Sequence, residues 1–194
     1  LFMWREYFGK NARIIGIDLN PLPKKWEKDG FEIHIGDQSN MDFWRSFYEQ
    51  VGPIDVLLDD GGHTNLQQIV TTCMAANLIR DGGLILIEDV HASYWDIFGN
   101  PSKFSFINYA KYIVDIINRR ASRVKKKGPN LYQEKVFSVE FYESIVVFNI
   151  DRRRCFMSQP TSNDGKSSDA EDFRHKGTVQ GLVRKIESKI GRSS

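Results

Sequence analysis

Cysteine and long apolar runs are the scarcest features of this 194-residue sequence. Its two cysteines, Cys73 and Cys155, lack the CxxC spacing of a zinc ribbon and are too few for a disulfide framework. Free thiols of this kind favour a reducing cytoplasmic location. No apolar run approaches the ~20 residues that a membrane span requires, and we expect no signal peptide. These absences exclude the transmembrane and disulfide-rich classes and leave a globular protein of about one domain.

The charge of the sequence is nearly balanced in total but unevenly distributed. The formal net charge is +2, from 27 Lys and Arg against 25 Asp and Glu. Residues 1–118 hold 10 basic and 16 acidic side chains, whereas residues 119–194 hold 17 and 9. Because most of the basic excess lies in short runs and not on the expected core, we expect no nucleic-acid partner.

Short apolar runs alternate with helix-period segments through the first half of the chain. Segments 40–51 and 64–80 repeat apolar side chains at helical spacing, and four runs rich in Ile, Val and Leu have the pattern of buried strands. These runs cover residues 13–18, 31–36, 54–59 and 84–88. Strand–helix–strand repetition favours parallel pairing with right-handed crossovers, so the sequence predicts an α/β fold with a doubly wound sheet.

The second half departs from this alternation. Residues 104–120 have a helical period, and residues 136–142 and 144–150 are strand-like runs with almost nothing between them, which permits only an antiparallel hairpin. Polar residues follow. We therefore predict three segments: an α/β domain over residues 1–151, a polar linker over 152–176, and a short basic amphipathic helix or tail over 177–194.

Acidic side chains follow four successive strands at the point where each strand ends. They are Asp18, Asp37, the pair Asp59 and Asp60, and the pair Glu88 and Asp89. In a doubly wound sheet, ligands bind at the carboxyl ends of the strands. A lone Asp there often only caps the next helix, and for Asp18 alone that role is as plausible as a functional one. Six carboxylates on one rim, however, repel one another unless a cation or hydrogen-bond donors lie among them.

The acidic residues divide into two chemical roles. Asp18 is placed to accept hydrogen bonds from the ribose hydroxyls of a nucleoside, and Asp37 to bind an adenine amino group. Asp60, Glu88 and Asp89 offer hard oxygen ligands without thiolates, a set that Mg²⁺ or Ca²⁺ prefers over zinc.

His63 closes the run DDGGH at residues 59–63. An imidazole beside a metal-bound hydroxyl can remove its proton at neutral pH, which makes His63 a candidate general base. A helix cap or a loop hydrogen bond is the alternative role. His91 lies within reach of the same rim, where we favour a loop role, and we assign no function to His34 or His175.

Four blocks of the sequence, taken in order, resemble the class I S-adenosylmethionine-dependent methyltransferases. These are IDLNP at residues 17–21, GDQ at 36–38, DDGGH at 59–63 and IED at 87–89. More narrowly, they resemble the Mg²⁺-dependent branch that contains macrocin- and mycinamicin-type sugar O-methyltransferases and cephalosporin-hydroxylase-like proteins. The resemblance covers about residues 1–150, and DDGGH and IED are its specific parts.

This resemblance implies a role for the residues of the two specific blocks. Asp60, Glu88 and Asp89 would ligate Mg²⁺. His63 would be the catalytic base on the acceptor hydroxyl.

It also implies how the cofactor is bound. Asp18 would hold the ribose of S-adenosylmethionine, Asp37 and Gln38 would contact its adenine end, and Asp59 would lie beside the methionine portion. The implied fold is a Rossmann-like sheet of seven strands, mostly parallel, whose last two strands form the hairpin. No glycine-rich turn such as GxGxxG precedes the helical pattern at residues 2–8. We therefore expect this chain to lack the first strand and its turn.

The expected activity is S-adenosylmethionine- and Mg²⁺-dependent methyl transfer to a hydroxyl of a sugar or glycosylated small molecule. The expected partner is that small molecule, and the sequence fixes neither its identity nor whether the protein is a homo-oligomer. Two other classes stay open: a non-catalytic nucleoside- or sugar-binding module, and another metal-dependent enzyme on the same fold. Thermal protection by S-adenosylmethionine or by NAD separates these classes. The missing dinucleotide fingerprint disfavours a dehydrogenase.

Overall fold

The computed structural model describes residues 1–99, 101–121, 124, 130–159, 177–179, 181–183 and 186. The chain divides into two compact units, Leu1–Gln159 and Pro160–Ser194, and the first carries all of the sheet structure described below. Within the described residues, no helix is both long enough and apolar enough to cross a membrane.

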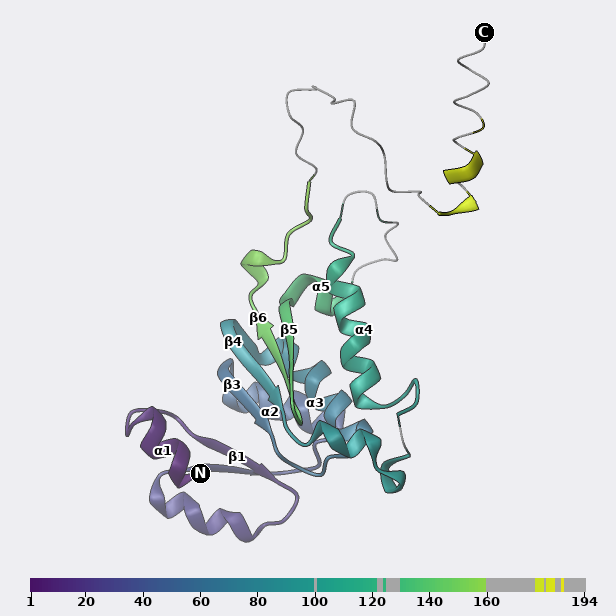
Figure 1. Ribbon diagram of the computed structural model, residues 1–194. Helices are drawn as coiled ribbons and strands as arrows, with labels where there is room; N and C mark the ends of the chain where they lie inside the picture. The colour runs from purple at the N-terminus through teal and green to yellow at the C-terminus, as the bar shows by residue number, and fades with distance from the viewer. Residues whose placement is uncertain are drawn as a thin grey trace. The chain divides into compact units, whose positions relative to one another are not determined.

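The described residues of the first unit form six strands and five α-helices, arranged as Figure 1 shows. The strands are β1 (Ile15–Asp18), β2 (Glu32–Ile35), β3 (Ile54–Asp59), β4 (Ile79–Ile87), β5 (Val136–Tyr142) and β6 (Ile145–Ile150). The helices are α1 (Phe2–Phe8), α2 (Met41–Val51), α3 (Asn65–Leu78), α4 (Phe106–Asn118) and α5 (Leu131–Lys135), with an eight-residue 3-10 helix, η1, at Leu22–Asp29.

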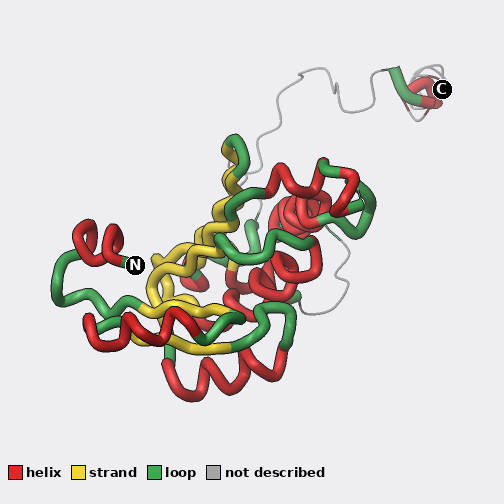
Figure 2. The backbone as a smooth tube through the Cα atoms, turned by 90° about the horizontal axis from the view of Figure 1, so that it is seen from below, coloured by secondary structure: helices red, strands yellow, loops and turns green. Residues whose placement is uncertain are grey.

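The strands pair as the sequence predicts, but in two sheets. β1 and β2 are parallel, and β3 and β4 are parallel in a four-stranded sheet of order β3-β4-β6-β5. β6 pairs antiparallel with both β4 and β5, which confirms the expected C-terminal hairpin. Among the described residues, no strand joins the β1–β2 pair to the four-stranded sheet. Figure 2 shows the strands with helices packed around them. The predicted α/β fold class is thus confirmed.

Local sequence signals explain where the two helices before the candidate site begin. Asn40 caps α2 by accepting hydrogen bonds from the backbone N–H groups of Asp42 and Phe43. Thr64 caps α3 in a reciprocal capping box with Gln67, which satisfies two N–H groups that would otherwise lack partners. α3 therefore starts two residues after His63.

The end of α3 differs from the sequence prediction. The helix was expected to reach residue 80 but ends at Leu78, and Ile79 already pairs with Ile54 as the first residue of β4. Ile79 is buried in the core, 1% exposed. Its pairing in the sheet therefore outweighs the helical spacing of the apolar residues that precede it. The register of the β3–β4 pairing shifts between the pair Ile54–Ile79 and the pair Val56–Leu84. Gly82, with φ 90°, lies in β4 between these two pairs.

The main core lies between the four-stranded sheet and its helices. Its fully buried side chains include Ile85 and Ile87 of β4, Phe148 of β6, and Phe106 and Ile113 of α4. A smaller core under β1 and β2 contains Ile14, Phe31 and Ile33. The main core also contains Leu57 of β3, so it supports both strands whose ends form the candidate site.

The predicted linker and tail fall largely outside the described residues. Residues 152–154 form a 3-10 turn, and Arg152 binds Asp81 at 2.7 Å, so this part of the predicted linker is fixed to the first unit. In the predicted tail, residues 179 and 181–183 are helical, and most of the rest is not described.

Candidate metal centre

The ends of β3 and β4 lie side by side. Asp59 pairs with Ile87 in the parallel ladder, and the Glu88 N–H donates to the Asp59 carbonyl at 2.9 Å. Asp60 and Asp89 therefore emerge from neighbouring strand ends, as the sequence predicts.

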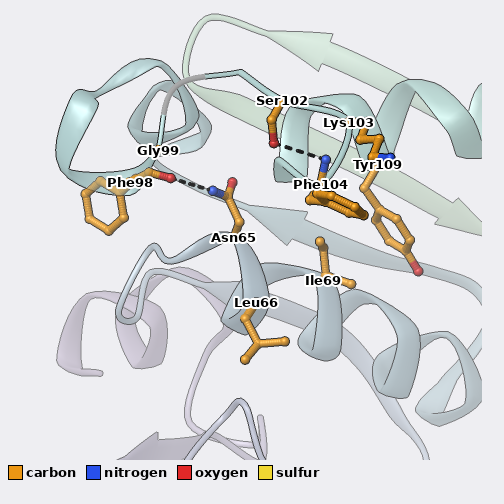
Figure 3. A pocket seen from close by; sticks show the side chains of 9 residues that line it. All are labelled: Asn65, Leu66, Ile69, Phe98, Gly99, Ser102, Lys103, Phe104 and Tyr109. Atoms are coloured by element: carbon orange, nitrogen blue, oxygen red, sulfur yellow. Dashed lines mark hydrogen bonds between the residues drawn. The ribbon is translucent and has the colours of Figure 1, made fainter.

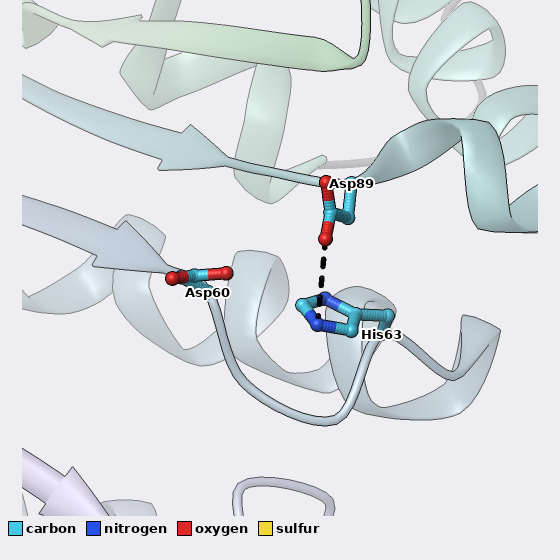
Figure 4. A group of neighbouring side chains, drawn as sticks. All are labelled: Asp60, His63 and Asp89. Carbon is cyan, nitrogen blue, oxygen red and sulfur yellow. Dashed lines mark ion pairs between the residues drawn. The ribbon is translucent and has the colours of Figure 1, made fainter.

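Three side chains converge at this rim (Figure 4). Asp60, His63 and Asp89 each present a ligand atom, and these atoms lie within 4.8 Å of one another. His63 Nε2 is 3.6 Å from Asp89 Oδ2. Opposite oxygens around an octahedral Mg²⁺ are about 4.2 Å apart, since each Mg–O distance is ~2.1 Å. A small inward movement would bring the carboxylates of Asp60 and Asp89 to this spacing, and carboxylate oxygens are the ligands that a hard divalent cation prefers.

Glu88 lies beside this cluster but is not part of it. Burial raises the pKa of the Glu88 carboxyl, and the negative charges of Asp60 and Asp89 raise it further, while His63 opposes them. The cluster holds Asp60, His63 and Asp89, and the predicted role of Glu88 as a metal ligand stays a prediction.

Unusual backbone geometry gathers at the same rim. Among the described residues, the non-glycine residues with positive φ are His63 (56°), Asp89 (52°) and Ser144 (62°). Left-handed conformations cost energy for residues with a Cβ atom, and they persist where the surrounding structure holds them. His63 also has a buried Nδ1 atom without a hydrogen-bond partner.

The loop between Asp60 and His63 is held by glutamine side chains. Gln38 donates to both carboxylate oxygens of Asp59, at 2.9 and 3.0 Å, and accepts from the Gly62 N–H at 3.2 Å. A Cβ atom on Gly61 would lie 2.0 Å from Gln38 Oε1, so a larger residue there would have to displace the Gln38 side chain. Asp59 is buried, 7% exposed, and its carboxylate is engaged by Gln38. The predicted contacts of Gln38 and Asp59 with a cofactor stay predictions.

The other two predicted cofactor residues form turns at strand ends. Asp18 Oδ1 accepts from the Asn20 N–H at 2.7 Å. Asp37 is exposed, and hydrogen bonds from the Ser39 backbone and hydroxyl lower the pKa of its carboxyl. Both aspartates therefore make the turn contacts that a lone Asp often makes after a strand. In each carboxylate, the second oxygen takes no part in these hydrogen bonds.

Two further residues contact this region, and sequence reasoning did not single them out. Ser144, from the β5–β6 turn, reaches Asp89 and His91. Asn65, the first residue of α3, binds the following loop by donating to the Phe98 carbonyl and accepting from Ser93 Oγ and the Phe106 N–H. Neither has a local signal, because both contacts join segments at least 28 residues apart.

A pocket of about 520 Å³ opens beside the start of α3 (Figure 3). Leu66 and Ile69 line it from α3, and Phe98, Phe104 and other residues line it from the loop before α4 and from α4 itself. Its volume lies in the range of small-molecule sites, and its walls combine aromatic and aliphatic side chains with a few polar groups.

No protein-family model matches the chain. In sequence it is similar to the L-olivosyl-oleandolide 3-O-methyltransferase of Streptomyces antibioticus, with 31% identity over 102 residues, which are 53% of this chain and 26% of that protein. It is also similar to the mycinamicin VI 2''-O-methyltransferase of Micromonospora griseorubida, with 28% identity over 155 residues, 75% of this chain and 37% of that protein.

The fold matches a solved methyltransferase. The MycE methyltransferase of the mycinamycin biosynthetic pathway, in complex with Mg and SAH, superposes with a TM-score of 0.71 at 20% identity, over 95% of this chain and 45% of that one. The chain spans less than half the length of the relatives that it matches. In sequence the chain is therefore similar to O-methyltransferases of the macrocin and mycinamicin type, and it shares the fold of MycE.

Proposed function

We propose that this chain forms the cofactor- and metal-binding part of an O-methyltransferase that uses S-adenosylmethionine and Mg²⁺ to methylate a sugar hydroxyl. The observation that carries the proposal is the convergence of Asp60, His63 and Asp89 at neighbouring strand ends. The names of the relatives support it, since each describes methyl transfer to an oxygen.

Each residue at the rim has one proposed task. Asp60 and Asp89 hold Mg²⁺, and Glu88 joins them by turning its side chain toward the ion. When bound, Mg²⁺ acidifies the acceptor hydroxyl and fixes its position. His63 accepts the proton of that hydroxyl, whose oxygen then bonds to the methyl carbon of S-adenosylmethionine as the bond from that carbon to sulfur breaks.

The cofactor would lie along the adjoining strand ends. Asp18 would bind its ribose, Asp37 and Gln38 its adenine end, and Asp59 would lie near its methionine part. Gly61 supports this placement, because a Cβ atom there would clash with Gln38 and the bare backbone allows a close approach.

The pocket beside α3 is where we place the rest of the acceptor. Asn65 lines it and is two residues from His63, so the pocket adjoins the base. The exposed ring of Phe104 and the exposed side chain of Leu66 suit an apolar group attached to the sugar. We also propose a cytoplasmic location, since both cysteines are free.

A methyl-transfer assay with a matched pair of variants tests the function. The purified protein is incubated with S-adenosylmethionine labelled in the methyl group, a glycosylated macrolide and Mg²⁺, with and without EDTA. Asp60→Ala should abolish transfer. Asp55→Ala should retain it, because Asp55 is at the opposite end of the same strand, where it pairs with Arg80 on the surface. Undiminished transfer in EDTA, or by the Asp60→Ala protein, would refute the proposal.

A further inference from the structure

Asp89 is held on the side that faces away from the metal cluster. Its Oδ2 atom lies 3.6 Å from His63, whereas its Oδ1 atom lies 3.5 Å from Ser144 Oγ and 3.7 Å from His91 Nδ1. One oxygen is thus turned toward the cluster and the other toward a serine and a second histidine.

The serine comes from a distant part of the chain. Ser144 is the second residue of the two-residue turn between β5 and β6, 55 positions after Asp89. Its carbonyl oxygen accepts from the Val90 N–H at 3.1 Å, next to the left-handed Asp89. Its hydroxyl contacts His91 Nδ1. Ser144 therefore contacts the Asp89–His91 segment through both its backbone carbonyl and its side-chain hydroxyl.

From this geometry we propose that Ser144 and His91 are positioning residues that orient Asp89 toward the metal ion, an inference that rests on the proposed function. With its proton on Nδ1, His91 donates to Ser144 Oγ, which leaves the serine hydroxyl proton free to point at Asp89 Oδ1. His91 is itself braced by the edge of Trp95, with ring centroids 4.8 Å apart. The chain Trp95–His91–Ser144–Asp89 thus connects the loop before α4 to the rim.

The choice of serine in this turn supports the proposal. Position 144 has φ 62°, a conformation that glycine adopts without strain and that asparagine tolerates well. A serine gains nothing there from the turn itself. Its hydroxyl, however, lies against two polar groups of the rim that no other described residue bridges.

Groups that hydrogen-bond a metal ligand from behind tune the affinity of the site, and their loss typically weakens binding 10- to 100-fold. The test is the dissociation constant of Mn²⁺, measured by electron paramagnetic resonance on the purified protein without cofactor. We expect Ser144→Ala and Ser144→Gly each to raise it about 10-fold. Ser144→Gly separates the hydroxyl from the backbone, because it removes the hydroxyl while relieving the left-handed strain.

Two controls make the result specific. Ser138→Ala removes a hydroxyl from the same hairpin, where Ser138 Oγ accepts a hydrogen bond from Asn149 Nδ2 at 2.9 Å, and it should leave the constant unchanged. His91→Phe keeps a ring against Trp95 and should weaken binding like Ser144→Ala. The double variant should be no weaker than either single one, because both break one linked arrangement.

The outcomes are distinct. If the unsubstituted protein binds Mn²⁺ and Ser144→Gly binds it equally well, the positioning role is refuted while the metal site stands. If the effects of Ser144→Ala and His91→Phe multiply, the two residues act separately and the linked arrangement is refuted. If the unsubstituted protein binds no Mn²⁺, both the metal site and this inference fail.

Discussion

Neutralising Asp60 should stabilise the protein when no metal is bound. The ligand atoms of Asp60 and Asp89 are within 4.8 Å, and two negative charges at that distance repel by about 0.9 kcal/mol in water and about 3.5 kcal/mol at an effective dielectric constant of 20. Asp60 is exposed and the Asp89 side chain is 45% exposed, so the lower end applies. We expect Asp60→Asn to gain about 1 kcal/mol, a rise in Tm of ~2–4 °C in EDTA.

The same substitution should remove the response to metal. For the unsubstituted protein, Mg²⁺ at 100 times its dissociation constant adds about 2.7 kcal/mol of stability, or roughly 5–10 °C in Tm. Asp60→Asn loses most of this gain because it loses a ligand. The two curves should therefore cross: the variant melts higher in EDTA and lower in Mg²⁺.

Calorimetry or dye-based melting in EDTA and in Mg²⁺ measures both effects. Asp55→Asn is the control, because it removes the same charge from the other end of β3, where Arg80 Nη1 lies 2.9 Å from the carboxylate. It should not raise Tm in EDTA and should keep the full metal response. An Asp60→Asn protein that melts lower than the unsubstituted one in EDTA, or that responds fully to Mg²⁺, would refute the reasoning.

Two further predictions concern proton transfer to His63 and the ionisation of Tyr109. His63→Gln should lower kcat for methyl transfer by about 10²- to 10⁴-fold, measured by turnover. The metal dissociation constant, measured by Mn²⁺ titration, should change only a few-fold. A large loss of metal affinity would make His63 a ligand and not a base. Burial raises the pKa of Tyr109 to about 12, against a hydrogen bond with Tyr132 that lowers it. The unfolded chain loses this proton near pH 10 and the folded one near pH 12, so folding stability falls over that window by at most about 2.7 kcal/mol. Urea unfolding at several pH values should show a shallower alkaline decline for Tyr109→Phe, and an unchanged decline would contradict the assignment.

The sequence was sufficient wherever the signal is local. Alternating apolar runs located the strands to within a few residues, apart from the early start of β4, and the near absence of a connection after Tyr142 required the antiparallel hairpin. The acidic strand ends placed Asp60 and Asp89 together, because parallel neighbours end at one edge. The sequence did not predict the early start of β4 at Ile79. Helical spacing of apolar residues cannot show that the last residues of the pattern pair with a neighbouring strand.

Long-range contacts were beyond the sequence for a physical reason. Gln38 has the same appearance in the sequence whether it meets a cofactor or Asp59, and its donation to the Asp59 carboxylate depends on how β2 and β3 are packed. Likewise, the pattern IED does not show that Asp89, and not Glu88, lies in the cluster with Asp60 and His63.

Three residues with left-handed backbone conformations lie together at the rim of the sheet. His63, Asp89 and Ser144 belong to three different loops, after β3, after β4 and between β5 and β6. They are held because the β3–β4 and β4–β6 ladders fix the three loop origins side by side, and because Val90 and the Asp89 side chain bind Ser144 across the gap. The sheet ladders therefore hold the backbone at Asp89, so a divalent cation that binds Asp89 would lose little affinity to the ordering of this ligand.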